Sequence, residues 1–232
     1  MRTLKTIIIA ASLLLSANAM QAQRHDFACY DCYAKANAEL GKPAKGEKRV
    51  VFLGNSITWG WVEQHPEFFK DNGFIGRGIS GQTSYQFLLR FRQDVIDLQP
   101  KVVVINYGTN DIALNTGPYD EDKTFGNVLS MVDIARANKI KVILTSCLPA
   151  GGFSWRPEVT DAMTKIRHLN ARVQAYAKKN KIPYVDYFSA LVTADGTEMN
   201  PAYANDRPGV HPNAEGYAIM ERLLLPVIEK LR

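Results

Sequence analysis

Short apolar runs alternate along the chain with longer segments in which apolar residues recur every three or four positions. This alternation is typical of repeated strand and helix units around a parallel sheet. The runs at 102–105 and 142–144 are continuously apolar, as in strands that are covered on both faces. The pattern therefore predicts an α/β protein, a three-layer α/β/α sandwich. Its expected strands lie at 49–53, 74–78, 102–107, 141–146 and 183–187, and its expected helices at about 84–97, 121–138, 157–180 and 213–231.

The first 23 residues have the pattern of a secretory signal peptide. Arg2 and Lys5 precede an apolar run at 7–15, and the small residues at 17–22 offer cleavage sites. That run is too short to cross a bilayer as a mature helix, and no later run approaches the roughly 20 apolar residues that a span needs. A lipid anchor at Cys29 is disfavoured, because this cysteine lies well beyond the apolar run. We therefore expect an exported protein, periplasmic or extracellular, with no membrane span.

The rest of the chain has the composition of one globular domain. Of its 232 residues, 46% are apolar and 22% are charged, which is typical of folded proteins. No repeat or linker divides the chain. We expect an N-terminal segment at 24–47, with a helix at 26–40 and a basic loop at 41–48, packed on one main domain at 48–232. Loss of the signal peptide lowers the formal net charge from +5 to about +3, and the remaining charges are scattered in sign, so we expect no nucleic-acid partner.

The chain has three cysteines, Cys29, Cys32 and Cys147. In an exported protein the first two could form a local disulfide or remain free thiols, and both alternatives stay open. A zinc site would need further ligands at suitable spacing, and Cys147 lies in an apolar strand-like run with no histidine near it. Redox or metal chemistry is therefore the least favoured interpretation, and no metal or other cofactor is expected.

Candidate functional residues come directly after the expected strands. In parallel α/β sheets, sites form outside the carboxyl ends of the strands, where the loops converge. Residues 54–58 (GNSIT) follow the first strand, 78–83 (GISGQT) the second and 108–111 (GTND) the third, while 208–213 (PGVHPN) precede the last helix. These four loops bring Ser56, Gly81, Asn110 and His211 to one rim.

These residue types suit acyl transfer. A serine hydroxyl is a poor nucleophile until a base such as histidine takes its proton, and neutral N–H donors can hold the oxyanion that develops on the attacked carbonyl. Each residue also has a simpler explanation by itself. Ser56 could cap a helix, Gly81 could allow a turn, Asn110 could form an Asx turn and His211 could be packed beside a helix. The convergence of all four on one rim favours the catalytic interpretation.

The same four blocks resemble those of the SGNH hydrolases, also called GDSL esterases and lipases. The order and spacing of the blocks match over about residues 48–231. The resemblance implies a flavodoxin-like sheet and an esterase or lipase activity. It also implies Ser56 as nucleophile, His211 as base, and an oxyanion hole formed by Gly81, Asn110 and the Ser56 backbone N–H.

Two positions depart from the family pattern. Asn55 stands where the family name has aspartate, which is a conservative change in the turn. The family usually has its acid three residues before the histidine, where this chain has Pro208. Asp206 lies five residues before His211, as if two residues had been inserted. We expect Asp206 to reach the His211 ring if the loop bulges. The alternative is a Ser56–His211 dyad in which a backbone carbonyl holds the ring.

The sequence gives less information on the substrate. Trp59, Trp61 and Trp155 are expected on the rim, where aromatic faces could stack on a sugar, although ordinary packing would explain each of them as well. Arg77 and Arg156 could bind an anionic group or pair with carboxylates such as Glu158. The connections between the elements are expected to be short, so no long apolar insertion offers a groove for a fatty chain. Trp59, Trp155 and Arg156 are our candidate substrate contacts.

These observations predict a serine esterase that hydrolyses small acyl esters, acetyl above all, on a carbohydrate. The expected partner is a small-molecule or glycan ester, and the oligomeric state is left open. A short-chain lipid or lysophospholipid esterase would use the same residues. A non-catalytic glycan-binding protein of the same fold is an alternative of another class, because it would need no acid at position 208. A flavin or phosphate binder is less favoured, because it would not need His211 or Asn110 on the rim.

Overall fold

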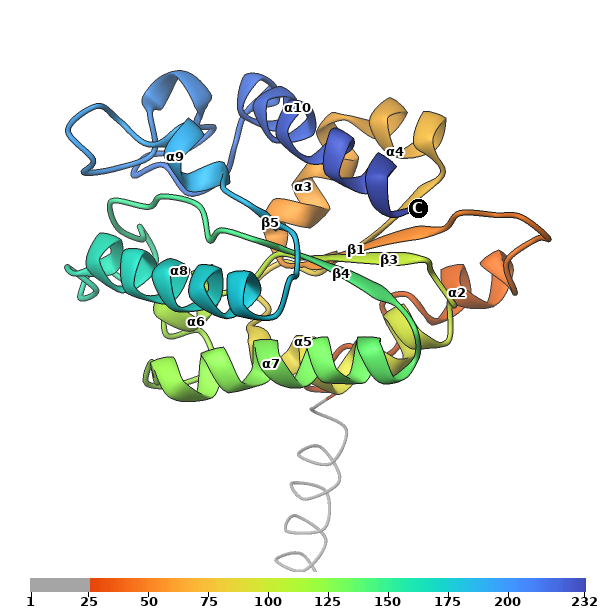
Figure 1. Cartoon of the computed structure of the whole chain (residues 1–232). Helices are drawn as coiled ribbons and strands as arrows, with labels where there is room; N and C mark the ends of the chain where they lie inside the picture. The colour runs from red at the N-terminus through yellow and green to blue at the C-terminus, as the bar shows by residue number, and fades with distance from the viewer. Residues whose placement is uncertain (1–25) are drawn as a thin grey trace, which may run out of the picture.

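The computed structural model describes residues 26–232, so the signal peptide expected at 1–23 lies outside the described residues. The centre of the fold is a sheet of five strands in the order β2-β1-β3-β4-β5, and every neighbouring pair is parallel. Helices lie above and below this sheet (Figure 1), which confirms the expected three-layer α/β/α sandwich with a parallel sheet. The strands are β1 (Val50–Gly54), β2 (Phe74–Gly78), β3 (Val102–Ile105), β4 (Lys141–Thr145) and β5 (Tyr184–Val185).

Each face of the sheet is covered by its own set of helices. One face carries α3 (Ser56–Gln64), α4 (Pro66–Asn72) and α10 (Ala214–Leu231); the other carries α5 (Ser84–Phe91), α7 (Glu121–Ala137) and α8 (Ala162–Lys179) (Figure 1). Alternate strand residues point to opposite faces, because side chains alternate along a strand. Val51 and Leu53 therefore pack in one buried cluster, and Val50 and Phe52 in the other. Burial on both faces explains why the strands are almost continuously apolar.

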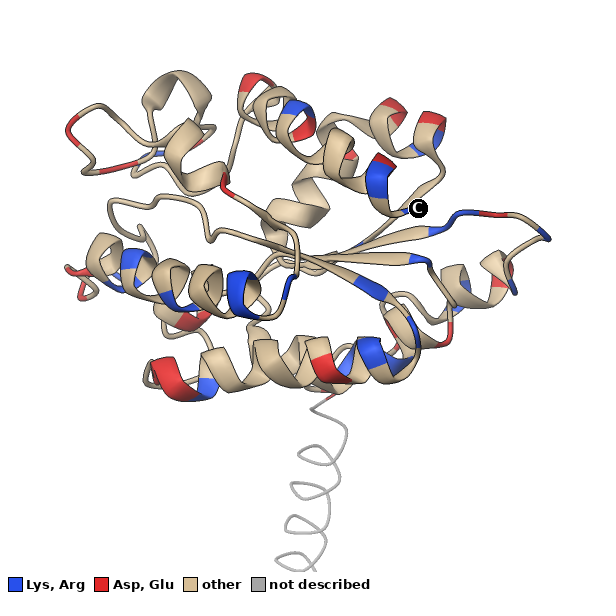
Figure 2. Cartoon of the chain, in the orientation of Figure 1, with Lys and Arg blue, Asp and Glu red and all other residues tan. Residues whose placement is uncertain are grey.

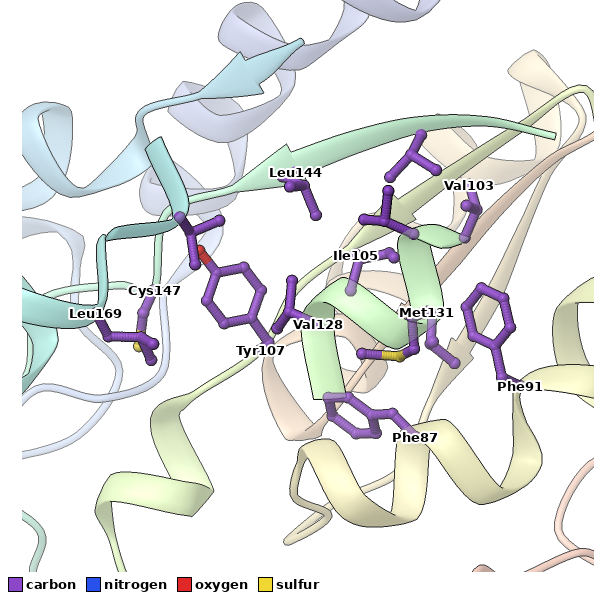
Figure 3. Packing of buried hydrophobic residues seen from close by; sticks show 14 of the residues in the cluster. Phe87, Phe91, Val103, Ile105, Tyr107, Val128, Met131, Leu144, Cys147 and Leu169 are labelled. Carbon is purple, nitrogen blue, oxygen red and sulfur yellow. The ribbon is translucent and has the colours of Figure 1, made fainter. Parts of the chain in front are cut away.

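Figure 3 shows the cluster between the sheet and α5 and α7. Phe87 and Phe91 from α5 meet Met131 from α7 beneath the strand residues Val103 and Ile105. All five side chains are almost completely buried. This dense packing fixes the strands relative to one another, and with them the loops at their carboxyl ends.

The remaining elements are short. They are α2 (Ala34–Leu40), a π-helical turn η1 (Arg92–Ile96), α6 (Thr109–Ile112), α9 (Tyr187–Leu191) and a 3-10 turn η2 (Pro201–Tyr203). The expected strands and helices match the observed ones to within a few residues, apart from the N-terminal helix. The expectation that all connections are short is wrong, because residues 146–161 and 192–213 form two long irregular segments interrupted only by the turn η2.

The N-terminal segment differs from the helix expected at 26–40. Only α2 is helical, while residues 26–33 form turns that are closed by a Cys29–Cys32 disulfide. Cys29 has a φ of 56°, a left-handed conformation that an α-helix excludes. The segment is held against α5 by glutamine side chains, since Gln82 donates to the carbonyl of Ala28 and Gln86 to that of Phe27. Of the alternatives for the first two cysteines, the structure therefore has the local disulfide.

Cys147 is a free, fully buried thiol, and burial raises its pKa to about 12. Most charged residues belong to helices and loops, and Arg77 in β2 and Lys141 in β4 are exceptions; along α7 and α10, basic and acidic residues are interspersed (Figure 2). Within residues 26–232, no helix is long and apolar enough to cross a membrane.

Candidate active site

Ser56 is the first residue of α3, directly after the strand-to-helix turn that follows β1. Asn55 caps this helix, because its side-chain Oδ1 accepts the backbone N–H of Ile57 at 2.9 Å. The N–H of Ser56 has no acceptor among the described residues, as is usual in the first turn of a helix. The turn therefore presents a hydroxyl and a free N–H at the same point, at the positive end of the helix dipole.

The start of α3 packs very closely against the end of β2. A Cβ at Gly78 would lie only 2.2 Å from the backbone nitrogen of Trp59 and 2.7 Å from the carbonyl oxygen of Asn55. Any residue larger than glycine would push the helix away from the strand. This close approach fixes the position of Ser56 relative to the loop that follows β2.

His211 lies next to Ser56, although the two residues are separated by 155 positions in the sequence. Ser56 Oγ is 2.9 Å from His211 Nε2, and His211 Nδ1 is 2.6 Å from Asp206 Oδ2. The second carboxylate oxygen of Asp206 accepts the backbone N–H groups of Val210 and His211, at 2.7 and 3.0 Å. The three side chains thus form a continuous hydrogen-bonded line.

The environment of Asp206 favours its charged form. Burial by itself would raise the pKa of this carboxyl, but the hydrogen bonds from the His211 ring and from two backbone N–H groups lower it below its ordinary value. The side chains of His211 and Asp206 are 32% and 36% exposed, so the line opens to solvent on one side. A carboxylate that stays ionised beside His211 can stabilise the imidazolium that forms when the ring accepts a proton.

The loop around Pro208 bulges, which lets Asp206 reach the ring despite the two additional residues. The two arms of this loop are paired, because the N–H of Asn205 donates to the carbonyl of His211 at 2.8 Å and Ala204 bridges to Pro212. Pro208 lies in the tip between these arms. The structure therefore places a carboxylate, and not a main-chain carbonyl, at His211 Nδ1.

The loop after β2 and the helix α6 supply further N–H groups. Gly81 has a φ of 76°, which favours glycine, and its N–H has no acceptor among the described residues. Asn110 is buried, and its side-chain amide donates one hydrogen to the carbonyl of Gln82 at 2.9 Å. An amide group has two such hydrogens, so one remains for a ligand.

Asp111, the neighbour of Asn110, has a structural role at the beginning of α5. It accepts the N–H and the hydroxyl of Ser84 and so fixes the beginning of α5. Burial raises the pKa of this carboxyl, and the hydrogen bonds from Ser84 and Thr124 oppose the change.

Three polar residues connect this site to its surroundings and were not singled out from the sequence: Asn115, Gln82 and Arg90. Asn115 donates to the carbonyl of Gly81 at 3.0 Å and accepts the indole N–H of Trp155 at 3.0 Å. Gln82 accepts from the buried Arg90 at 2.6 Å. A signal for Arg90 was present, because it is a charged residue on the apolar face of an amphipathic helix. For Asn115 no sequence signal stood out.

The aromatic and basic candidates differ in their surroundings. Trp155 is 40% exposed and its ring centre lies 6.5 Å from that of His211, while Trp59 is 50% exposed. Trp61 was wrongly expected on the rim, because it is 3% exposed and packs among the aromatic residues beneath α3. Arg77 is also buried and donates to Asn37, which removes it as an anion-binding candidate.

Arg156 forms an ion pair with Glu158 at 3.8 Å and keeps a side chain that is 41% exposed.

No group of three or more His, Cys, Asp or Glu side chains within residues 26–232 is placed to hold a metal ion. That the chemistry needs no metal remains a prediction.

Comparison with known proteins shows the family to which the chain belongs. The model of the GDSL-like lipase/acylhydrolase family matches residues 52–219. A crystal structure of a GDSL-like lipase from Bacteroides thetaiotaomicron is 62% identical, with a TM-score of 0.86 over 88% of this chain and 99% of that one. An acetyl xylan esterase, AlAXEase, is 25% identical, with a TM-score of 0.63 over 77% of this chain and 98% of that one.

Two curated relatives are more distant. The esterase TesA of Pseudomonas aeruginosa is 28% identical over 68% of this chain and 78% of its own length. The lipoprotein YqeF of Bacillus subtilis is 32% identical over 47% of this chain, and the match spans about half (52%) of YqeF. The chain belongs to the GDSL-like lipase/acylhydrolase family, which confirms the resemblance to the SGNH hydrolases. Members of this family are esterases and lipases, so the class of activity is that of an acylhydrolase.

Proposed function

We propose that this protein is a serine esterase that removes small acyl groups, acetyl above all, from a carbohydrate. The observation that carries the proposal is the hydrogen-bonded line from Asp206 through His211 to Ser56, with spacings of 2.6 and 2.9 Å. Such a line is what a serine hydroxyl needs to become a nucleophile.

Each residue of the site has a role in this reaction. His211 Nε2 takes the proton of Ser56 as its hydroxyl attacks the ester carbonyl, and Asp206 holds the ring and stabilises its charge. The oxyanion receives hydrogen bonds from the N–H groups of Ser56 and Gly81 and from the second amide hydrogen of Asn110. His211 then returns the proton to the leaving alcohol. Water completes the cycle when it attacks the acyl-enzyme with the same residues in place.

The surroundings of Ser56 support a small acyl group on a large, polar alcohol. The triad is partly exposed, and Trp155 and Trp59 offer open aromatic faces of the kind that stack on sugar rings. Arg156 is a further proposed contact. The similarity to an acetyl xylan esterase is consistent with this substrate class.

Two other functions use the same fold. A short-chain lipid or lysophospholipid esterase is supported by the similarity to a GDSL-like lipase. A glycan-binding protein without catalysis is less well supported, because the carboxylate that such a protein could lose is in place beside His211.

Export after removal of a signal peptide at 1–23 is also part of the proposal. The Cys29–Cys32 disulfide supports it, because disulfides persist mainly in oxidising compartments. The relative YqeF is a lipoprotein, which fits a protein that leaves the cytoplasm.

The test is a panel of acetylated oligosaccharides and of aryl esters from acetate to octanoate, run on purified mature protein. We expect the highest kcat/KM on acetyl esters, and release of acetate from the sugars. A preference for octanoate or for lysophospholipids would favour the lipid esterase instead. Binding of glycans without turnover of any ester would favour the binding protein.

A further inference from the structure

Arg90 is a completely buried cation within 26–232, at the core of the domain on α5. Its relative exposure is 0%, and it lies between Phe87 and Phe91 on the apolar face of the helix. Burial of a guanidinium is costly unless the group is paired with an opposite charge and hydrogen-bonded. Arg90 is paired with Asp94, whose Oδ2 accepts from Nη1 at 2.9 Å.

The other two hydrogen bonds of Arg90 lead to the catalytic loops. Its Nη2 donates to the carbonyl of Gly54 at 2.9 Å, at the end of β1 and two residues before Ser56. Its Nε donates to the side-chain Oε1 of Gln82 at 2.6 Å, directly after Gly81. One rigid guanidinium therefore joins the serine turn to the loop that follows β2.

Gln82 extends this connection to Asn110. Its backbone carbonyl accepts the Asn110 amide at 2.9 Å, and its side-chain Nε2 donates to the carbonyl of Ala28. Gln82 is only 3% exposed and is thus held from several sides. The three proposed oxyanion donors come from three separate loops, and Arg90 with Gln82 links all of them.

We propose that Arg90 is a positioning residue for acyl transfer, which sets the Ser56 turn and the Gly81 and Asn110 donors at the spacing that the oxyanion requires. The inference rests on the proposed esterase function. Lysine could keep the charge beside Asp94, but it lacks the planar fork that reaches Gly54 and Gln82 together. Arg90 does not touch the substrate, so its effect should appear in kcat rather than in KM.

The chain offers a matched control in Arg49. This arginine is 2% exposed and bonds Glu47 and the carbonyls of Gly41 and Leu98. It precedes β1, so its bonds lie at the opposite end of the strand from Gly54, about 16 Å away for five residues. Arg49 and Arg90 are therefore alike in burial and bonding and differ in their distance from Ser56.

The experiment compares Arg90→Lys with Arg49→Lys in the full mature chain. We measure kcat and KM on an aryl acetate, and thermal unfolding. Both variants should lose stability, but only Arg90→Lys should lower kcat, by about 10²-fold as when an oxyanion donor is misplaced, with KM within about threefold. Equal kcat values in the two variants, or a loss confined to KM, would overturn the inference.

A second variant decides the matter if Arg90→Lys does not fold. Gln82→Met removes the side-chain link and leaves the backbone carbonyl that holds Asn110, so we expect kcat to fall by about tenfold or more with KM little changed. Wild-type kcat in Gln82→Met would count against the inference. Failure of the proposed esterase function would give a different result. The wild-type protein would then hydrolyse no ester, and a fluorophosphonate would not label Ser56. That result would overturn the inference about Arg90 as well.

Discussion

Asp206 contacts His211 at two places, with one carboxylate oxygen 2.6 Å from the ring Nδ1 and the other 3.0 Å from the backbone nitrogen of the same residue. The carboxylate thus fixes both the ring and the main chain that carries it. Because the imidazole ring is held in one orientation, its Nε2 stays directed at Ser56.

Replacement of Ser56 by alanine removes the proposed nucleophile. We expect kcat on an aryl acetate to fall by several orders of magnitude in Ser56→Ala, because no other hydroxyl is bonded to His211 Nε2 within the described residues. Circular dichroism should show an unchanged fold. The control is Ser80→Ala, since Ser80 is an exposed serine of the neighbouring loop. Activity of Ser56→Ala within tenfold of wild type would contradict the assignment.

Replacement of Asp206 tests the acid. Asp206→Asn keeps the shape of the side chain but removes the charge that stabilises the imidazolium, so kcat should fall by about 10²- to 10⁴-fold. Asp195→Asn is the control, because Asp195 is an exposed carboxylate of the same long connection. A loss smaller than about tenfold in Asp206→Asn would mean that Ser56 and His211 act as a dyad.

The lowered pKa of Asp206 also predicts how stability depends on pH. A carboxyl whose pKa is lower in the folded state stabilises the fold above its unfolded-state pKa, about 3.9, and this contribution is lost as the pH falls through the folded-state value. The difference in Tm between wild type and Asp206→Asn should therefore be constant from pH 7 to about 5 and shrink below about pH 4. A difference that stays constant down to pH 2.5 would refute this assignment of the charge.

Trp155 is expected to bind the alcohol part of the substrate. Loss of an aromatic stacking partner is worth about 0.5–1.5 kcal/mol, so Trp155→Ala should raise KM for an acetylated oligosaccharide by roughly two- to tenfold. KM for a small aryl acetate should change less. Trp59→Ala is the comparison, since Trp59 is also exposed but has no contact with the His211 ring comparable to that of Trp155. Equal KM values for the sugar in wild type and both variants would exclude sugar stacking.

The site is expected to work without a metal ion. Incubation with a chelator, followed by gel filtration, should leave kcat on an aryl acetate unchanged, because hydrogen bonds and a general base supply the chemistry of the proposed reaction. Inactivation that a divalent ion reverses would show that this expectation is wrong.

Much of the fold could be predicted because its strands are apolar over their whole length and its helices have a clear period. The rim residues Ser56, Gly81, Asn110 and His211 could be selected because each follows a strand or precedes a helix in a short polar block. The N-terminal helix was placed too early, because a local pattern does not reveal the left-handed turn at Cys29. The positions of Trp61 and Arg77 depended on which side of an element faces the core, and this is decided by packing between distant segments.

The hydrogen bonds that connect residues within the site could not be predicted from the sequence either. Asn115 joins Gly81 to Trp155, and Arg90 joins Gly54 to Gln82, across separations that no local motif encodes. The bulge that brings Asp206 to His211 could be named only as one of two alternatives, because the path of a loop depends on the pairing of its two arms.

Ser56 and His211 are 155 positions apart in the sequence, so the proposed active site can form only late in folding. The proposed nucleophile belongs to the first strand-to-helix unit of the domain. The proposed base directly precedes the last helix, α10, which packs against α3 through a hydrogen bond from Tyr217 to the carbonyl of Ile57. A chain whose C-terminal part has not yet joined the domain would hold the serine without a histidine fixed beside it. Hydrolysis should therefore begin only when folding is complete, and an incompletely folded molecule should not hydrolyse the esters around it.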